Sequence, residues 1–181
     1  SLNPKHYQTY VSYLIKFIHA YQKHGIPIHA ITLQNEPNYQ TNDYPSMLMT
    51  ASEHINLLKI LGPAFEKQKI DSKIFVWDHN WEHTPSLRKL LYDPNVSHYI
   101  SGTAWHGYAG NPSMLSAIHT DFPDKAIYFT EITGTQDYTD FSQNLAWSLQ
   151  FALFGNLRNW AETVLYWNLA LNDKGGPFIS P

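Results

Sequence analysis

Apolar residues in the first part of the chain recur at the spacing of an amphipathic helix. Between residues 3 and 22 they stand at Tyr7, Tyr10, Val11, Leu14, Phe17, Ile18 and Tyr21. Asn3 is placed to cap this helix, Pro4 fits its first turn and Gly25 follows its end. The next segment, PIHAITLQ, is a short apolar run, typical of a strand covered on both faces. The pattern therefore predicts a helix followed by a buried strand.

The same alternation of helix and strand continues along the chain. Strands are predicted at 28–34, 73–77, 101–105, 126–130 and 163–167. Helices are predicted from Met47 through Leu61, ending near Gly62-Pro63 or slightly later, and at 85–92, about 112–119 and 141–153. This order indicates βαβ units and a parallel sheet. No linker interrupts it, so residues 1–181 are expected to form one domain, either a doubly wound sheet or part of a (β/α)8 barrel.

Polar side chains follow every predicted strand. They are Asn35-Glu36, Asp78-His79-Asn80, His106-Gly107-Tyr108, Glu131 and Asn168. Parallel α/β folds bind their ligands at the carboxyl ends of the strands, so these residues are expected to line one cleft. Neither GxGxxG nor a P-loop occurs there, which argues against a nucleotide cofactor.

Composition and charge narrow the range of partners. The chain has 12 Lys and Arg against 15 Asp and Glu, and the basic residues do not cluster, so no nucleic acid partner is expected. Aromatic residues make up 15% of the chain and often adjoin polar ones, as in WDHNWEH, which suits a sugar as well as it suits ordinary core packing. There is no cysteine to form a thiolate metal site. No apolar run is long enough for a membrane span, and the N-terminus lacks the apolar core of a signal peptide.

Two carboxylates stand out because each follows an apolar strand. Glu36 lies in LQNEP and Glu131 in YFTEITG. Two carboxyls that face one cleft are what acetal cleavage needs, since one protonates the leaving oxygen while the other attacks the sugar carbon or activates water. For either Glu alone, a surface ion pair or a helix cap is the simpler reading. The pair favours glycoside hydrolysis.

Four motifs in order resemble glycoside hydrolase family 30, the glucosylceramidase-like enzymes. They are ITLQNEP, AWHGY, YFTE and YWNLALNDKGGP, and they span residues 31–177. The resemblance implies a (β/α)8 barrel, with Glu36 as general acid/base, Glu131 as nucleophile and Asn35 bonded to the sugar 2-hydroxyl. It also implies that His106 and Tyr108 line the site, with Tyr108 near the nucleophile, and that Trp167 forms an aromatic floor. Asp78, His79 and Asn80 are expected to face the cleft, and Asp78 and Asn80 are included among the candidate substrate contacts.

The resemblance also implies that the chain is part of a barrel. A complete eightfold barrel takes about 250 residues, and in the family's numbering the predicted strands are four to eight. Strands one to three and a β-rich side domain are therefore expected to be absent from this chain. Such a partial barrel exposes strand edges, which favour association, and leaves the cleft open on one side. We expect little or no turnover from the isolated chain.

The expected reaction is hydrolysis of a β-glucoside with retention, through a covalent glycosyl-enzyme and without metal or other cofactor. The main expectation is a glucosylceramidase-like activity, and an endo-β-1,6-glucanase of the same family is the alternative. The family resemblance also favours a secreted or extracellular protein.

Two other functions remain open at this stage. The segment from His79 to His83 matches H-x-x-E-H, a zinc-peptidase pattern that requires a helix through both histidines. It follows a predicted strand and meets Pro85 almost at once, which argues against a zinc hydrolase. A half barrel that binds carbohydrate through its aromatic residues without cleaving it is the second alternative.

Overall fold

A single parallel sheet forms the centre of the computed structural model, which describes residues 1–134 and 140–168. Its five strands are β1 (Ala30–Thr32), β2 (Lys73–Trp81), β3 (Ile100–Gly110), β4 (Ala126–Glu131) and β5 (Thr163–Val164). Each strand pairs in parallel with its neighbour in the sequence, so the order is β1-β2-β3-β4-β5. A doubly wound sheet would reverse its strand order at a switch point, whereas a barrel adds strands in sequence. The order confirms the partial-barrel alternative.

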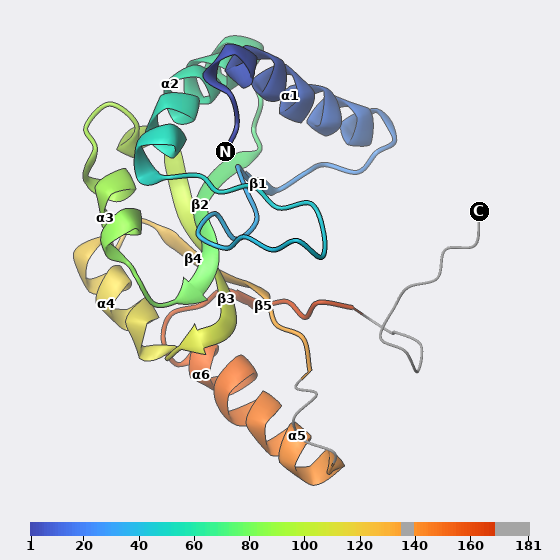
Figure 1. Ribbon diagram of the computed structural model, residues 1–181, viewed down its shortest axis with the longest axis vertical. Helices are drawn as coiled ribbons and strands as arrows, with labels where there is room; N and C mark the ends of the chain where they lie inside the picture. Colours follow the sequence, from blue (N-terminus) through green and yellow to red (C-terminus); the bar gives the residue numbers. More distant parts are fainter. Residues whose placement is uncertain (135–139, 169–181) are drawn as a thin grey trace.

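Helix α1 precedes β1, the other helices lie between successive strands, and the helices lie around the outer side of the sheet (Figure 1). They are α1 (Tyr7–Lys23), α2 (Ala51–Gln68), α3 (Pro85–Tyr92), α4 (Ser113–Asp121), α5 (Phe141–Trp147) and α6 (Phe154–Leu157). Short 3-10 turns, η1 (Pro4–His6) and η2 (Ser97–Tyr99), precede α1 and β3, and a π-helical turn, η3 (Ser148–Leu153), joins α5 to α6. Within the described residues, no helix has the length and apolar character needed to cross a membrane.

Helix α2 runs past Pro63 and ends at Gln68, which agrees with the expected end near Gly62-Pro63 or slightly later. An interior proline costs the helix a backbone hydrogen bond. That loss is offset by burial of Leu57, Leu58 and Leu61, which are 0% exposed. A Thr50–Glu53 capping box fixes the start of the helix. Tertiary packing thus determines where this helix ends.

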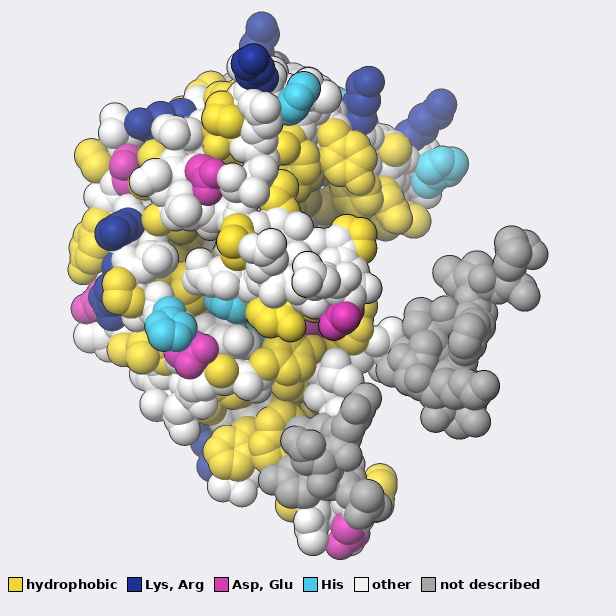
Figure 2. Space-filling view, in the orientation of Figure 1, with side chains coloured by type: hydrophobic (Ala, Val, Ile, Leu, Met, Phe, Trp, Pro, Cys, Tyr) yellow, Lys and Arg dark blue, Asp and Glu magenta, His cyan; other side chains and the backbone are white. Residues whose placement is uncertain are grey.

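The core lies between the sheet and its helices. Trp77 and Trp105 are 2% and 0% exposed, whereas Trp147 is half-buried. Apolar side chains also remain exposed along α1, at Tyr13, Phe17 and Tyr21. Figure 2 shows hydrophobic side chains on the surface in the region of that helix. The sheet ends in two short edge strands, β1 and β5.

Candidate active site

An irregular stretch of β2 brings the first acidic side chain into the cleft. Trp77 and Asp78 have positive φ angles of 80° and 52°, and the pairing with β3 shifts between Trp77 and His79. Such a bulge re-aims the side chains that follow it. The bulge is also tied to the loop after β1, because the backbone N–H of Glu36 donates to the Asp78 carbonyl over 2.9 Å. Glu36 itself has a φ of 47°.

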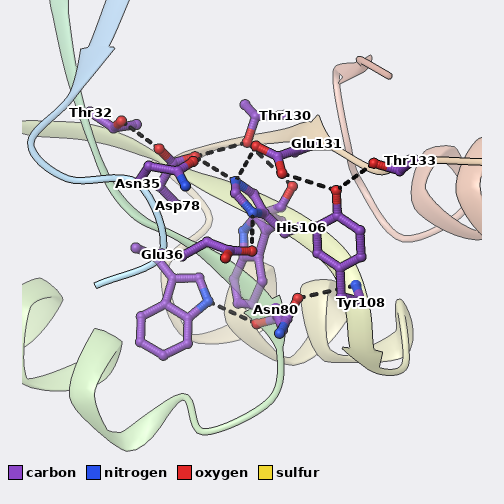
Figure 3. A network of polar contacts seen from close by, with 12 residues as sticks. Thr32, Asn35, Glu36, Asp78, Asn80, His106, Tyr108, Thr130, Glu131 and Thr133 are labelled. Carbon is purple, nitrogen blue, oxygen red and sulfur yellow. Dashed lines mark hydrogen bonds and ion pairs between the residues drawn. The ribbon is translucent and has the colours of Figure 1, made fainter. Parts of the chain in front are cut away.

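His106 lies at the centre of a polar network contributed by three strands and the loop after β1 (Figure 3). Its side chain is 1% exposed. Nδ1 lies 2.9 Å from Glu36 Oε1, and Nε2 lies 3.0 Å from Asp78 Oδ1. Glu131 Oε2 is 3.7 Å from the same Nε2. One imidazole therefore contacts three carboxyl groups.

The surroundings of His106 decide its charge. Burial alone lowers the pKa of this imidazole, but hydrogen bonds to Asp78 and Glu36 and the charge of Glu131 outweigh burial and raise the pKa to about 9. At neutral pH His106 is an imidazolium that donates to carboxylates from both nitrogens. The positive charge holds acidic groups together that would otherwise repel each other.

Tyr108 makes the corresponding contact to Glu131. Its hydroxyl donates to Glu131 Oε1 over 3.0 Å and lies 3.1 Å from Thr133 Oγ1. Burial raises the pKa of the Glu131 carboxyl. The charge of His106 and the hydrogen bond from Tyr108 lower this pKa, whereas the charge of Glu36 raises it. Burial raises the pKa of Tyr108 to about 12, so Tyr108 remains a hydrogen-bond donor.

Three threonines that were not among the predicted site residues complete the network. Thr32 Oγ1 donates to Asp78 Oδ2 over 2.6 Å, and Thr130 Oγ1 donates to Asp78 Oδ1 over 3.1 Å. Thr133 is the hydroxyl partner of Tyr108. Thr32 and Thr130 lie in ITLQNEP and YFTE, and each precedes a carboxylate, Glu36 and Glu131. A threonine near the end of each of these strands is the sequence feature that could have identified them.

The structure brings all eight predicted site residues to one region. A cavity of about 680 Å³ is lined by Asn35, Glu36, Asn80, Tyr108, Glu131 and Trp167. A second cavity, of about 490 Å³, shares Asn35, Glu131 and Trp167 and adds Asp78 and His106. The last predicted strand ends at Val164 rather than 167, and Asn168 follows Trp167 in the described chain, whereas residues 169–177 of the YWNLALNDKGGP motif lie outside the described residues.

The expected positions relative to the strands were wrong in detail. Asp78, Asn80, His106 and Tyr108 lie inside β2 and β3, because both strands run several residues beyond their predicted ends. Asn80 Oδ1 accepts a hydrogen bond from the backbone N–H of Tyr108 over 3.1 Å, and so holds the ends of these strands together. The polar residues that were expected just after these two strands are thus part of the strands themselves.

The zinc-peptidase reading of the H-x-x-E-H segment is wrong, because the required helix is absent. His79 lies on β2 and is 6% exposed, whereas the His83 side chain is 76% exposed and lies 3.6 Å from Glu82. The two histidines therefore do not share a helical face.

One group of residues has spacing suited to a metal ion. Among the described residues, donor atoms of Glu36, His106 and Glu131 lie within 4.8 Å of one another. Both nitrogens of His106 already face carboxylate oxygens, and an imidazolium has no lone pair for a metal. The expectation of chemistry without a metal stays a prediction.

Comparisons with known proteins agree on the family. Residues 2–180 match the Glycosyl hydrolase family 30 TIM-barrel domain. An endo-1,6-β-D-glucanase, neg1, from Aspergillus fumigatus is 33% identical over 174 residues, which is 94% of this chain and 34% of the relative. The lysosomal acid glucosylceramidase of Mus musculus is 30% identical, with 94% of this chain and 36% of the relative covered.

The solved structures give the same result. The endo-β1,6-glucanase BT3312 superposes with a TM-score of 0.92 at 35% identity, over 98% of this chain and 41% of that one. The chain therefore spans about a third of these curated relatives and two fifths of this solved structure. With the family match extending over nearly all of its residues, the chain belongs to glycosyl hydrolase family 30.

Proposed function

We propose that this chain carries the catalytic carboxylates of a retaining β-glycoside hydrolase that acts on β-1,6-linked glucan. The observation that supports the reaction class best is the short separation of Glu36 and Glu131, whose oxygens lie within 4.8 Å of each other. Retaining enzymes hold their carboxyls about 5 to 5.5 Å apart, whereas inverting enzymes need roughly 6.5 to 9.5 Å for a water molecule.

The two carboxylates take different roles in this proposal. Glu131 attacks the sugar C1 carbon and forms a covalent glycosyl ester, while Glu36 protonates the oxygen of the leaving group. Glu36 then removes a proton from water, which attacks C1 and releases Glu131. The hydrogen bond from Tyr108 supports this assignment because it stabilises the ionised form of Glu131. A nucleophile must be ionised, and the raised pKa of Glu131 works against its ionisation. The charge of Glu36 contributes to that raised pKa. We therefore expect protonation of Glu36 to lower the pKa of Glu131.

The surrounding residues position these groups and the sugar. His106 holds Glu36 and Asp78 from opposite sides of its ring, and this fixes the direction of the Glu36 carboxyl. Asn35 lines the cavity next to Glu36 and is proposed to bond the sugar 2-hydroxyl. Trp167, with 60% of its surface exposed, offers a flat face beneath the sugar. Asp78 and Asn80 act by organising the site.

Relatives of two kinds bear on the substrate. Endo-1,6-β-glucanases at 33% and 35% identity favour β-1,6-glucan over the glucosylceramidase activity that was the main sequence expectation. Glucosylceramide is the second candidate, supported by the 30% identity to the mouse enzyme. Both substrates present a β-glucosidic bond, so the catalytic residues would be the same.

A single-turnover cleavage assay tests this proposal and separates the substrates. The chain, in excess, is incubated with β-1,6-linked gluco-oligosaccharides and, separately, with glucosylceramide, and products are identified by mass spectrometry. We expect cleavage of the oligosaccharides by the wild-type chain and none by Glu131→Gln, which should still bind them. Cleavage of glucosylceramide alone would favour the second candidate. Binding of oligosaccharide with equal products from both variants, or with none from either, would contradict the catalytic proposal.

A further inference from the structure

Two tyrosines form a wall on one side of the candidate active site. Tyr39 and Tyr44, in the segment between β1 and α2, are 46% and 54% exposed and line the main cavity. A small adjoining cavity of about 50 Å³ is lined by Glu36 and both tyrosines but not by Glu131. The cavity of about 490 Å³ contains Glu131 and Trp167 but neither Glu36 nor the tyrosines. The tyrosine wall therefore lies on the Glu36 side.

His79 also lines the main cavity and, like the two tyrosines, does not line the cavity of about 490 Å³ that contains Trp167. Burial lowers the pKa of His79, and Glu36 is the strongest of the charges that oppose this shift. The imidazole is therefore neutral at neutral pH, with one protonated nitrogen and one bare nitrogen. The mechanism proposed above does not use this residue.

The hydrogen bonding of His79 indicates which nitrogen faces a ligand. Nδ1 is buried and has no hydrogen-bond partner among the described residues. A buried N–H without an acceptor is rarer and costlier than an unpaired acceptor, so the proton belongs on Nε2. His79 is more than nine-tenths buried and still lines the cavity, so we infer that Nε2–H is the donor it offers to a bound molecule.

A general acid stands beside the group that it protonates as that group leaves. Residues that gather on the side of Glu36, away from Glu131, are therefore placed to contact the leaving group. We propose that Tyr44 and His79 form a subsite for the sugar unit on the leaving-group side of the scissile bond. This inference rests on the proposed function, because it takes Glu36 as the acid.

The chemistry of this subsite fits a second sugar better than a lipid. The Tyr44 ring offers a flat surface for the C–H face of a hexose, and its hydroxyl remains a polar contact. His79 supplies one directed donor to a sugar hydroxyl. The hydrocarbon chains of a ceramide carry no acceptor for the Nε2–H donor of His79, whereas a second hexose presents several hydroxyl groups to it. The subsite thus deepens the β-1,6-glucan proposal by assigning residues to the second glucose.

Calorimetric binding to two ligands that resist cleavage tests the subsite in the chain as it stands. The ligands are methyl β-D-thioglucoside, which fills one sugar position, and a sulfur-linked β-1,6 diglucoside, which fills two. We expect the wild-type chain to bind the diglucoside roughly tenfold more tightly. Tyr44→Ala and His79→Gln should each reduce this preference roughly three- to tenfold, while affinity for the monosaccharide stays unchanged.

Matched variants separate the subsite from general effects. Tyr44→Phe keeps the ring and should keep most of the preference, and His24→Gln, at the exposed C-terminal end of α1, should have no effect. Circular dichroism checks that each variant is folded. Equal affinity for the two ligands in the wild-type chain, or a preference unchanged in folded Tyr44→Ala and His79→Gln, would overturn the subsite. Because no cleavage is measured, failure of catalysis would leave this result intact.

Discussion

His106 shows how one residue sets the electrostatics of the candidate site. The sequence predicted that His106 lines the cleft, and Figure 3 places it between Glu36 and Asp78. Its charge could not be predicted, because it depends on contacts between residues 28 and 70 positions apart in the chain. The role of Asp78 was missed for the same reason: its threonine partners come from β1 and β4.

The raised pKa of His106 predicts a pH-dependent contribution to stability. Folding raises the pKa from an ordinary 6.5 to about 9, so the stabilisation is fully present below pH 6.5 and is lost as pH rises through 9. Its size is on the order of 3 kcal/mol. Thermal unfolding between pH 6.5 and 10 should show this loss in the wild-type chain and not in His106→Gln.

A second histidine provides an internal comparison for this titration. Burial lowers the pKa of His54 to about 4, so its contribution to stability is lost as pH falls below 6.5. The two effects occupy separate pH ranges. If the wild-type chain and His106→Gln lose stability equally between pH 6.5 and 9, the imidazolium assignment is wrong.

At the level of elements, periodicity predicted the order and type of the main helices and strands. It did not predict how far β2 and β3 extend, because the added residues do not continue the apolar run and are held by pairing between strands. The helix expected at 141–153 is α5 followed by the π-helical turn, and buried Asn156 donates to the Ala152 carbonyl within that region over 2.7 Å. A hydrogen bond from a side chain to a backbone carbonyl does not change the spacing of apolar residues, so this spacing does not reveal the π-helical turn.

Asn156 also links this turn to the strands of the site. Its Oδ1 accepts a hydrogen bond from Trp81 Nε1 over 3.1 Å, and the Trp81 ring stacks on Phe129 with centroids 5.3 Å apart. A Cβ on Gly107 would lie 3.0 Å from the Trp81 ring and 2.9 Å from Phe129. The absence of a side chain at Gly107 therefore lets these rings pack under His106 and Tyr108.

We predict that Asn156→Leu destabilises the fold by about 1 to 3 kcal/mol, because it removes the acceptor of the buried Trp81 N–H and the donor to the Ala152 carbonyl. Urea unfolding, followed by Trp fluorescence and circular dichroism, measures the change. Asn95→Leu is the matched control, since Asn95 is exposed and bonds within its own turn, and should change stability by less than about 0.5 kcal/mol. Equal stability of Asn156→Leu and wild type would refute the proposed link.

At the scale of the whole molecule, the sheet is open at two edges. The edge strands β1 and β5 contain three and two residues, and short edges offer few unpaired backbone groups to another strand. The exposed aromatic side chains of α1 add apolar surface, so association of the chain stays a prediction. Order and spacing in the sequence predicted the βαβ units, because each unit is specified locally, whereas the choice of a barrel segment over a doubly wound sheet came from the family resemblance.

The open sheet also explains why weak turnover is still expected. The cavity between Glu36 and Glu131 is formed by five strands and their loops, and an open cleft admits water that weakens electrostatic stabilisation. Formation of a covalent intermediate requires only one event per molecule. A trapping experiment is therefore a more direct test of the two carboxylates than a steady-state rate.

The most direct test is intact-mass measurement after exposure to a 2-fluoro β-glucoside with an activated leaving group. The fluorine slows both steps by destabilising the oxocarbenium-like transition state, and the good leaving group preserves the first step, so the glycosyl-enzyme accumulates. We predict one added 2-fluoroglucosyl group, located on Glu131 by peptide mapping and absent from Glu131→Gln. No adduct, or an adduct on another residue that persists in Glu131→Gln, would contradict the assignment of Glu131 as nucleophile.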